Sequence, residues 1–251
     1  AGFLLTAVTN WTGLPTLSGL PLLILFLLWA LARVLAFLPA TVSLWPMIMC
    51  NVVFMVYLTV AVMIPIIKAR LWRQSAVFSK LMLMMVSSGV LYWALLHQDF
   101  IMERKTIRFT VYMVISLILT MGRRIMPFFI EGGVGYPVKL RNSRVLDIVS
   151  LVLLVVFCYA DIFTHEGWLT AAAALLLVLV HGLRLAGWHT HGVWQRPLLW
   201  ILFAGYMFLI LGFLLKAAAF VYPKCDDSAL HAFTTGGIGI FCIGMMARVS
   251  L

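Results

Sequence analysis

Long apolar runs separated by short polar segments are the dominant pattern of this chain. Each run approaches the ~20 residues that a helix needs to cross a bilayer. The segments between the runs carry turn-forming residues, as in NWTGLPTLSG and VYPKCDDS. The pattern predicts a partial first span at 1–8 and eight complete or nearly complete spans. These eight are expected at residues 20–38, 44–67, 78–97, 106–126, 145–163, 168–187, 197–222 and 228–249. The expected fold class is therefore all-α, a polytopic transmembrane helix bundle.

The composition extends the membrane assignment to the whole chain. Apolar residues make up 64% of the 251 residues and charged residues only 10%, whereas a soluble domain of this length needs more charge to cover its surface. No polar stretch is long enough to fold alone, so residues 1–251 are expected to form a single transmembrane helical domain. The chain opens on AGFLLTAV and stops directly after an apolar run, which indicates a fragment of a longer protein.

The net charge of +10 lies in short loops between apolar runs, which argues against nucleic-acid binding and instead orients the protein in the membrane. The basic residues of one set of loops are Lys68, Arg70, Arg73, Lys80, Arg123, Arg124, Lys139, Arg141, Arg144, Arg184, Arg196 and Arg248. Those of the opposite loops are only Arg104, Lys105, Arg108 and Lys224. Cytoplasmic loops carry the excess of lysine and arginine, so the first set is expected to face the cytoplasm.

This orientation sorts the six histidines by depth. The outer side is expected to hold His97, His165 and His231, and the inner side His181, His189 and His191. A rise of ~1.5 Å per residue puts His181 ~20 Å from the outer face and His231 only ~6 Å from it. These two side chains therefore cannot be the two axial ligands of one haem, and two separate clusters are expected, one at each face.

His231, in SALHAFTTGG, is the leading candidate for chemistry because an ionisable side chain in a spanning helix is costly. Its imidazole could ligate haem or copper, or it could simply hydrogen-bond a neighbouring loop. The glycines after it allow close approach of a flat cofactor, although ordinary helix packing explains them better. His181 is the best inner candidate for a metal ligand, without an obvious partner. The loop pair His189 and His191 is a weak metal site for want of a third ligand.

Four basic residues have alternative interpretations. Arg123 and Arg124, in GRRIMPFF, are either anchors at the lipid head groups or partners of haem propionates, and Pro127 is expected to end their helix. Arg33, about mid-span, and Lys216, in the outer half of its helix, are expected to face the bundle interior and to be paired.

The four cysteines form no CxxC pair, which excludes a zinc ribbon or thioredoxin-type site. No catalytic triad, P-loop or dinucleotide fingerprint is present, so an enzymatic activity is left open.

Several motifs together resemble the NnrS family. They are AGFLLTAVTNWTG, GRRIMPFF, the stretch from Arg184 through Trp188 to Pro197-Leu-Leu-Trp200, and LHAFTTGGIGIFCIGMMARVSL. The resemblance spans the chain and implies a bacterial inner-membrane protein of about a dozen helices, associated with haem, copper and tolerance of nitric oxide. Family members carry His-x-His-Glu just before AGFLLTAV and Gly-His just after the last residue here. Where this chain has Phe203, the family often has histidine, and phenylalanine cannot ligate iron.

The leading functional hypothesis is therefore a haem- and copper-containing membrane protein that contributes to tolerance of nitrosative stress, with the lipid bilayer and nitric oxide as its partners. His231 is expected to ligate haem or copper at the outer level with a histidine of the upstream motif, and His97, at the same depth, is a candidate neighbour. Haem contacts are assigned to Arg123, Arg124 and Arg33. An NO reductase is not expected, because no ring of histidines for a binuclear centre is visible. The alternatives are a secondary transporter or channel, and a supporting subunit of a respiratory complex.

Overall fold

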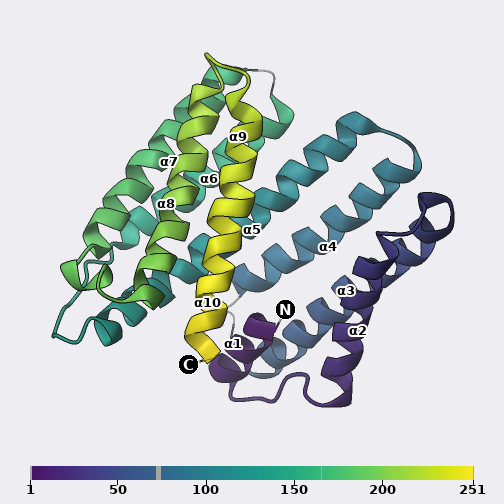
Figure 1. The fold of residues 1–251 in the computed structure, drawn as a ribbon, viewed down its shortest axis with the longest axis horizontal. Coiled ribbons are helices and arrows are strands. Elements are labelled where there is room, and N and C mark those ends of the chain that lie inside the picture. Colours follow the sequence, from purple (N-terminus) through teal and green to yellow (C-terminus); the bar gives the residue numbers. More distant parts are fainter. Residues whose placement is uncertain (1, 72–74, 165, 251) are drawn as a thin grey trace. The chain divides into compact units, whose positions relative to one another are not determined.

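The computed structural model describes residues 2–71, 75–164 and 166–250, and these residues form helices joined by short loops (Figure 1). The first helices are α1 (Gly2–Thr12), α2 (Leu20–Leu35), α3 (Ala40–Lys68), α4 (Ser75–Leu96) and α5 (Phe100–Gly133). They are followed by α6 (Arg144–Phe163), α7 (Gly167–Trp188), the 3-10 turn η2 (His191–Val193) and α8 (Pro197–Ala218). The last run consists of α9 (Cys225–His231), the π-helix η3 (Ala232–Gly239) and α10 (Ile240–Ser250). No strand occurs in these ranges, so the all-α prediction is confirmed.

Within the described residues, seven helices are long and apolar enough to cross a membrane, and the last of them runs without a break through α9, η3 and α10 to Ala247. This confirms a multi-pass membrane protein. The helix expected at 20–38 is shorter, with 16 residues from Leu20 to Leu35. The α-helical conformation is disfavoured for the residue before a proline, and Pro39 is the N-cap of α3. The chain therefore turns between Leu35 and Pro39.

The helix expected at 106–126 is longer than its pattern indicated. α5 covers 34 residues, and Pro127 lies inside it instead of ending it. A proline in a helix interior removes one backbone hydrogen bond and costs ~3 kcal/mol. Burial of neighbouring side chains offsets this cost, because Met126 before Pro127 and Ile130 after it are both fully buried. Burial of two such side chains stabilises by roughly 1.5–3 kcal/mol each.

The chain divides into two compact units, Ala1–Thr110 and Val111–Leu251. The prediction of a single domain over 1–251 stays a prediction. In the first unit α3 is central: α1, α2 and α4 all pack against it. The loop between α1 and α2 turns at Gly13 and Gly19, whose φ angles of 65° and 58° favour glycine. A hydrogen bond of 2.8 Å between Thr9 and Thr16 closes this loop onto α1.

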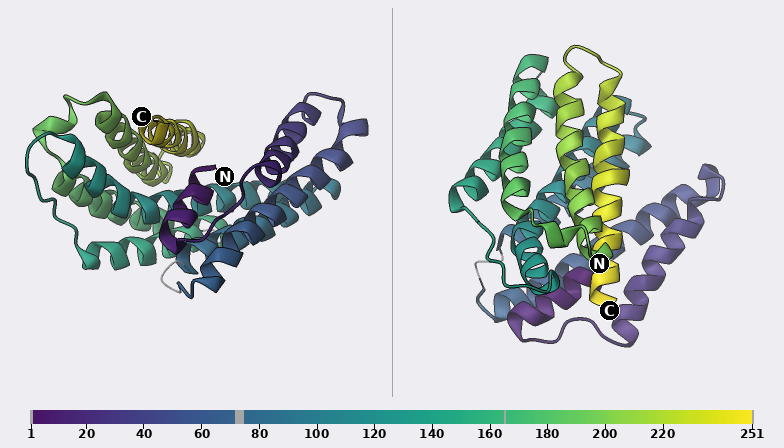
Figure 2. Two further views of the ribbon diagram at one scale, coloured as in Figure 1. Left: turned by 90° about the horizontal axis from the view of Figure 1, so that it is seen from below. Right: turned by 60° about the vertical axis from the view of Figure 1, so that its left-hand side comes forward.

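In the second unit α7 packs between α6 and α8, and α8 also packs along the continuous run of α9, η3 and α10. The two neighbours, α8 in light green and the last run in yellow, lie side by side in both views of Figure 2. Glycines make this approach possible. A Cβ on Gly212 of α8 would lie 2.5 Å from the Phe233 ring, and one on Gly205 would lie 3.0 Å from the Phe241 backbone nitrogen.

The glycines of the GGIG segment serve the same contact from the other side. A Cβ on Gly236 would lie 2.4 Å from the Phe208 ring, and one on Gly237 would lie 2.2 Å from Leu209. Small residues that let two helices approach closely are a general feature of membrane bundles. Among the described residues these two glycines pack against α8, which supports the helix-packing interpretation.

Candidate functional site

One end of the second unit is held together by the carboxylate of Asp147, in the first turn of α6. Arg123 Nη1 of α5 donates to Asp147 Oδ2 over 2.8 Å, and Arg184 Nη2 of α7 donates to Asp147 Oδ1 over 2.9 Å. Arg184 also donates to the Ser150 hydroxyl, 3.2 Å away. We call these four residues the Asp147 network. It ties three helices together, and its two guanidinium groups share one carboxylate.

This arrangement bears on the arginines expected to contact haem propionates. Arg123 is half-buried and paired with Asp147, so it is more than an anchor at the head groups, and its Nε has no hydrogen-bond partner within the described chain. The Asp147 network contains one more cation than anion, a charge balance that fits an added carboxylate. Arg124 is exposed on the next position of α5. The structure thus leaves a carboxylate-binding role of Arg123 chemically open, and the role stays a prediction.

His181 lies one turn before Arg184 on α7 and is fully buried. Its Nδ1 is 2.7 Å from the hydroxyl oxygen of Tyr206 on α8, and the Arg184 guanidinium lies beside that hydroxyl. The other ring nitrogen, Nε2, is buried without a partner in the described residues. The His181 ring stacks on Phe213, with 6.0 Å between centroids. The residue opposite His181 is therefore a tyrosine, which the sequence did not indicate.

Phe203, the position where histidine was expected from the family pattern, does not have His181 among its ring neighbours. Its ring packs edge-on against His189 at 6.1 Å and Trp194 at 5.6 Å. His189 Nε2 accepts a hydrogen bond of 3.0 Å from Trp194 Nε1. This bond occupies the lone pair that a metal would need, which agrees with the expectation that His189 and His191 form only a weak metal site. His191 is exposed at the start of η2.

The other end of the second unit is held together by Lys216, near the end of α8. Its ammonium nitrogen lies 2.7 Å from Asp161 Oδ1 of α6 and also pairs with Asp226 at the start of α9. Tyr112 of α5 donates its hydroxyl to Asp161 Oδ2 over 2.6 Å. We call these four residues the Lys216 network. Lys216 and Asp161 are each only 6% exposed, which confirms that Lys216 faces the interior and is paired.

The prediction for Arg33 is only partly confirmed. Its Nη2 donates to Asn51 Oδ1 of α3 over 2.8 Å, so it is paired as expected. It is nevertheless exposed on the first unit and lies in the last turn of α2, so its expected place at mid-span in the interior is wrong. The reason is the early end of this helix at Leu35. A cofactor contact of Arg33 stays a prediction.

His231 and His97 share one local geometry. Nδ1 of His231 lies 2.9 Å from the Asp227 carbonyl, and Nδ1 of His97 lies 2.8 Å from the Trp93 carbonyl. A carbonyl oxygen only accepts, so Nδ1 carries the proton in both rings and Nε2 presents its lone pair. Both side chains are exposed in their own units. Metal-bound histidines commonly donate the other N–H to such a carbonyl. His165, the third outer histidine, lies outside the described residues.

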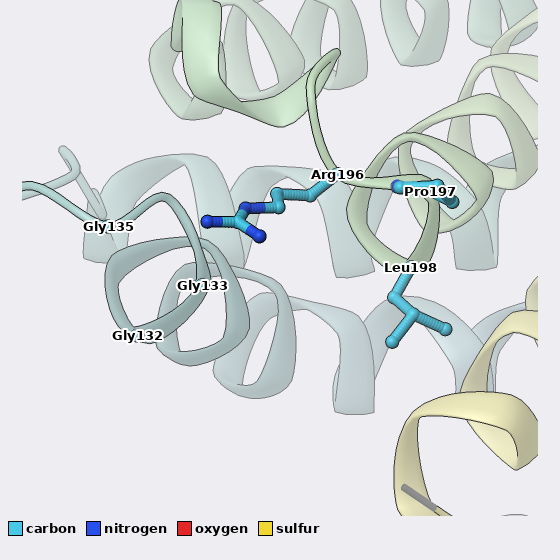
Figure 3. Close-up of a pocket in the computed structure, with 6 residues that line it drawn as sticks. All are labelled: Gly132, Gly133, Gly135, Arg196, Pro197 and Leu198. Atoms are coloured by element: carbon cyan, nitrogen blue, oxygen red, sulfur yellow. The ribbon is translucent and has the colours of Figure 1, made fainter.

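Two further observations limit the site chemistry. No group of three or more His, Cys, Asp or Glu side chains that could hold a metal ion occurs in residues 2–71, 75–164 and 166–250. A cleft of about 470 Å³, which the sequence did not indicate, is lined by Gly132, Gly133, Gly135, Arg196, Pro197 and Leu198. In Figure 3 the Arg196 side chain extends toward the glycine turn that follows α5. This lining offers a cation but no metal ligand.

Sequence comparison places these features in a family. No curated protein and no solved structure matches the chain. A family model described as NnrS protein matches residues 1–251. Because the match runs over the full length, this multi-pass membrane protein belongs to the NnrS family.

Proposed function

We propose that the protein contributes to tolerance of nitric oxide as a haem- and copper-containing protein of the bacterial inner membrane. Membership of the NnrS family and the seven membrane-length helices support this proposal. The observation that carries it is the exposed His231 side chain, whose Nδ1 proton is held by the Asp227 carbonyl so that Nε2 keeps its lone pair. A bound haem iron or copper ion would supply a coordination position for a small gas such as nitric oxide.

The proposed metal ligand is His231 Nε2. In the first unit His97 is a second candidate ligand in its own right, because its Nδ1 proton is held in the same way. The fixed tautomer presents a lone pair and raises the basicity of the ligating nitrogen. No group of three or more His, Cys, Asp or Glu side chains that could hold a metal ion occurs in the described residues. The partner proposed for His231 is a histidine of the upstream motif that the family resemblance implies.

The two proposed cofactor contacts, His231 and Arg123, belong to separate sites. Asp147, which holds Arg123, and Asp161, which belongs to the Lys216 network near His231, lie on the same helix α6. At ~1.5 Å per residue their separation along α6 is about 21 Å. A haem ligated by His231 therefore takes no propionate contact from Arg123. This agrees with the expectation of two clusters, one at each face.

The orientation is proposed from the excess of basic residues on one side, which places the Asp147 network at the cytoplasmic face and Cys225 at the periplasmic face. Cys225 is partly exposed at the start of α9. In a variant that keeps only this cysteine, a membrane-impermeant maleimide added to intact spheroplasts is expected to label the protein. A variant that keeps only the buried Cys158 is the control for non-specific labelling. Labelling of Cys225 only after lysis would reverse the orientation.

The metal assignment is tested with the full-length protein. His231→Ala is expected to remove most of the bound haem or copper, because its Nε2 is the proposed ligand, whereas His189→Ala is expected to keep it, because His189 Nε2 is bonded to Trp194. The absorbance of the Soret band and elemental analysis for iron and copper are the measurements. Full occupancy of both cofactors in His231→Ala would refute the assignment. A purified wild-type protein with neither metal nor Soret band would refute the proposed function itself.

A further inference from the structure

The interior of the second unit contains a line of hydrogen-bonding side chains that starts at the Asp147 network. From Arg184 it continues to the Tyr206 hydroxyl and from there to Nδ1 of His181. Tyr206 and His181 are both fully buried. Ionisable groups in a membrane interior are costly, and they mark functional sites such as ion pathways and proton relays by default.

A layer of aromatic rings separates this line from the Lys216 network. Phe213 stacks on His181 and packs edge-on against Phe157 at 5.4 Å and Phe233 at 4.9 Å. Tyr112, on the far side of the layer, packs against Phe157 at 5.0 Å and donates its hydroxyl to Asp161. We call Phe157, Phe213 and Phe233 the aromatic layer. All three rings are buried, so the layer excludes water between the two networks in this structure.

His181 is the group that faces the aromatic layer from the Asp147 side. The Arg184 guanidinium lies beside the Tyr206 hydroxyl and can only donate, which favours the orientation in which the hydroxyl donates its own proton to His181 Nδ1. Nε2 then carries the ring proton, and this N–H is buried without an acceptor among the described residues. A buried donor left unsatisfied in a native structure calls for a functional explanation.

We propose that the second unit transfers protons between the Asp147 and Lys216 networks, with His181 as the relay and the aromatic layer as the gate. When the layer opens and admits water, Nδ1 takes the Tyr206 hydroxyl proton and Nε2 releases its own proton through that water to the Asp161 carboxylate, which passes it on to water at the Lys216 network. The Tyr206 oxygen regains a proton from water that reaches the Asp147 network. One proton enters for each that leaves, and no electron moves. Rotation of the imidazole ring then turns the Nδ1–H toward the layer and the Nε2 lone pair toward Tyr206, so the next transfer runs with the two nitrogens exchanged and a second rotation completes the cycle. The proposal does not depend on haem, copper or nitric oxide.

The gate is carried by a helix segment suited to movement. Phe233 lies in η3, the eight-residue π-helix, and π-helical turns are frequently found at functional sites. Its ring lies directly over Gly212, where a side chain would occupy the same space. Displacement of Phe233 and Phe213 would admit water between His181 Nε2 and the Tyr112 hydroxyl. A proton is the species that fits this path, because both of its ends are hydrogen-bonding networks and its middle is packed with side chains.

The test uses the full-length protein in liposomes that contain a pH-sensitive dye, with a potassium diffusion potential as the driving force. Phe213→Ala opens the layer and is expected to raise the proton flux several-fold above that of protein-free vesicles. Adding His181→Gln to this variant is expected to return the flux to the protein-free level, because glutamine retains a polar contact to Tyr206 but cannot relay a proton. Phe163→Ala, which removes an exposed ring of α6, is the matched control and is expected to change nothing.

Two results would overturn the proposal. One is a flux in Phe213→Ala that persists with His181→Gln, since this indicates a general leak through a damaged bundle. The other is the absence of a flux in both Phe213→Ala and Phe233→Ala when each elutes as a monodisperse protein. The second gate variant guards against a folding defect in the first. The metal content of His181→Gln, measured in parallel, separates this role from the metal-ligand role considered for His181.

Discussion

Asp147→Asn is expected to lower the free energy of unfolding by about 3–5 kcal/mol, the cost of breaking a buried ion pair by removing one partner. Arg184 bears most of this cost, because its side chain is only 3% exposed and its guanidinium faces Asp147 at 2.9 Å. Arg123 is 27% exposed and can turn toward water, so its share is smaller. The asparagine retains a hydrogen-bond acceptor but no longer neutralises the two cations.

The measurement is the unfolding transition of the detergent-solubilised full-length protein, followed by tryptophan fluorescence. Asp227→Asn is the matched control: this aspartate is exposed, and such a substitution is expected to change stability by less than about 0.5 kcal/mol. The double variant Asp147→Asn/Arg184→Gln removes both buried charges and is expected to recover a substantial part of the loss. An Asp147→Asn protein as stable as the wild type would show that the guanidinium of Arg184 reaches water or another anion.

The helical content of this chain could be predicted from the sequence, because apolar runs of membrane length can satisfy their own backbone hydrogen bonds only as helices. Without water in the bilayer core, each segment must satisfy its own hydrogen bonds. The ends of the helices were less predictable. Pro127 was expected to end a helix that continues to Gly133, because a local rule could not include the burial of Met126 and Ile130. α2 ends early at Leu35, although its apolar run continues to Leu38.

The candidate site shows a similar limit. The sequence indicated that Lys216 needs a partner in the interior, because a cation in a membrane span is costly, and it is paired. It did not indicate which residues serve as partners. Tyr206 meets His181 from a position 25 residues away, and Asp147 meets Arg184 from 37 residues away. Such pairings depend on which faces of α6, α7 and α8 turn inward.

The two carboxylates inside predicted spans were a signal that could have been used more fully. Asp147 and Asp161 lie near opposite ends of the predicted span 145–163, and each holds one of the buried networks. Acidic residues within a membrane helix are rare and almost always paired. Applying this rule to the acids as well as to Arg33 and Lys216 would have indicated both networks, although not the aromatic layer between them.

Lys216→Met is the second substitution expected to have a large effect, again of about 3–5 kcal/mol, because it removes the cation between two carboxylates at a buried site. Asp161 is only 6% exposed and loses the ammonium group 2.7 Å away, and the nearby Asp226 loses the same partner. The two negative charges then repel one another in surroundings that screen them poorly. Since Asp226 lies in the first turn of α9, the expected consequence includes loosening of α9 from α8.

Rescue separates the ion pair from the loss of lysine packing. Lys216→Met/Asp161→Asn removes one carboxylate, and the asparagine can still accept the hydrogen bond from Tyr112, so this double variant is expected to be more stable than Lys216→Met. Lys224→Met, at an exposed lysine just before α9, is the matched control and is expected to be near neutral. Thermal unfolding in detergent is compared across the four proteins. If Asp161→Asn gives no recovery in the Lys216→Met background, the stabilisation comes from the packing of the lysine chain and the ion-pair explanation is wrong.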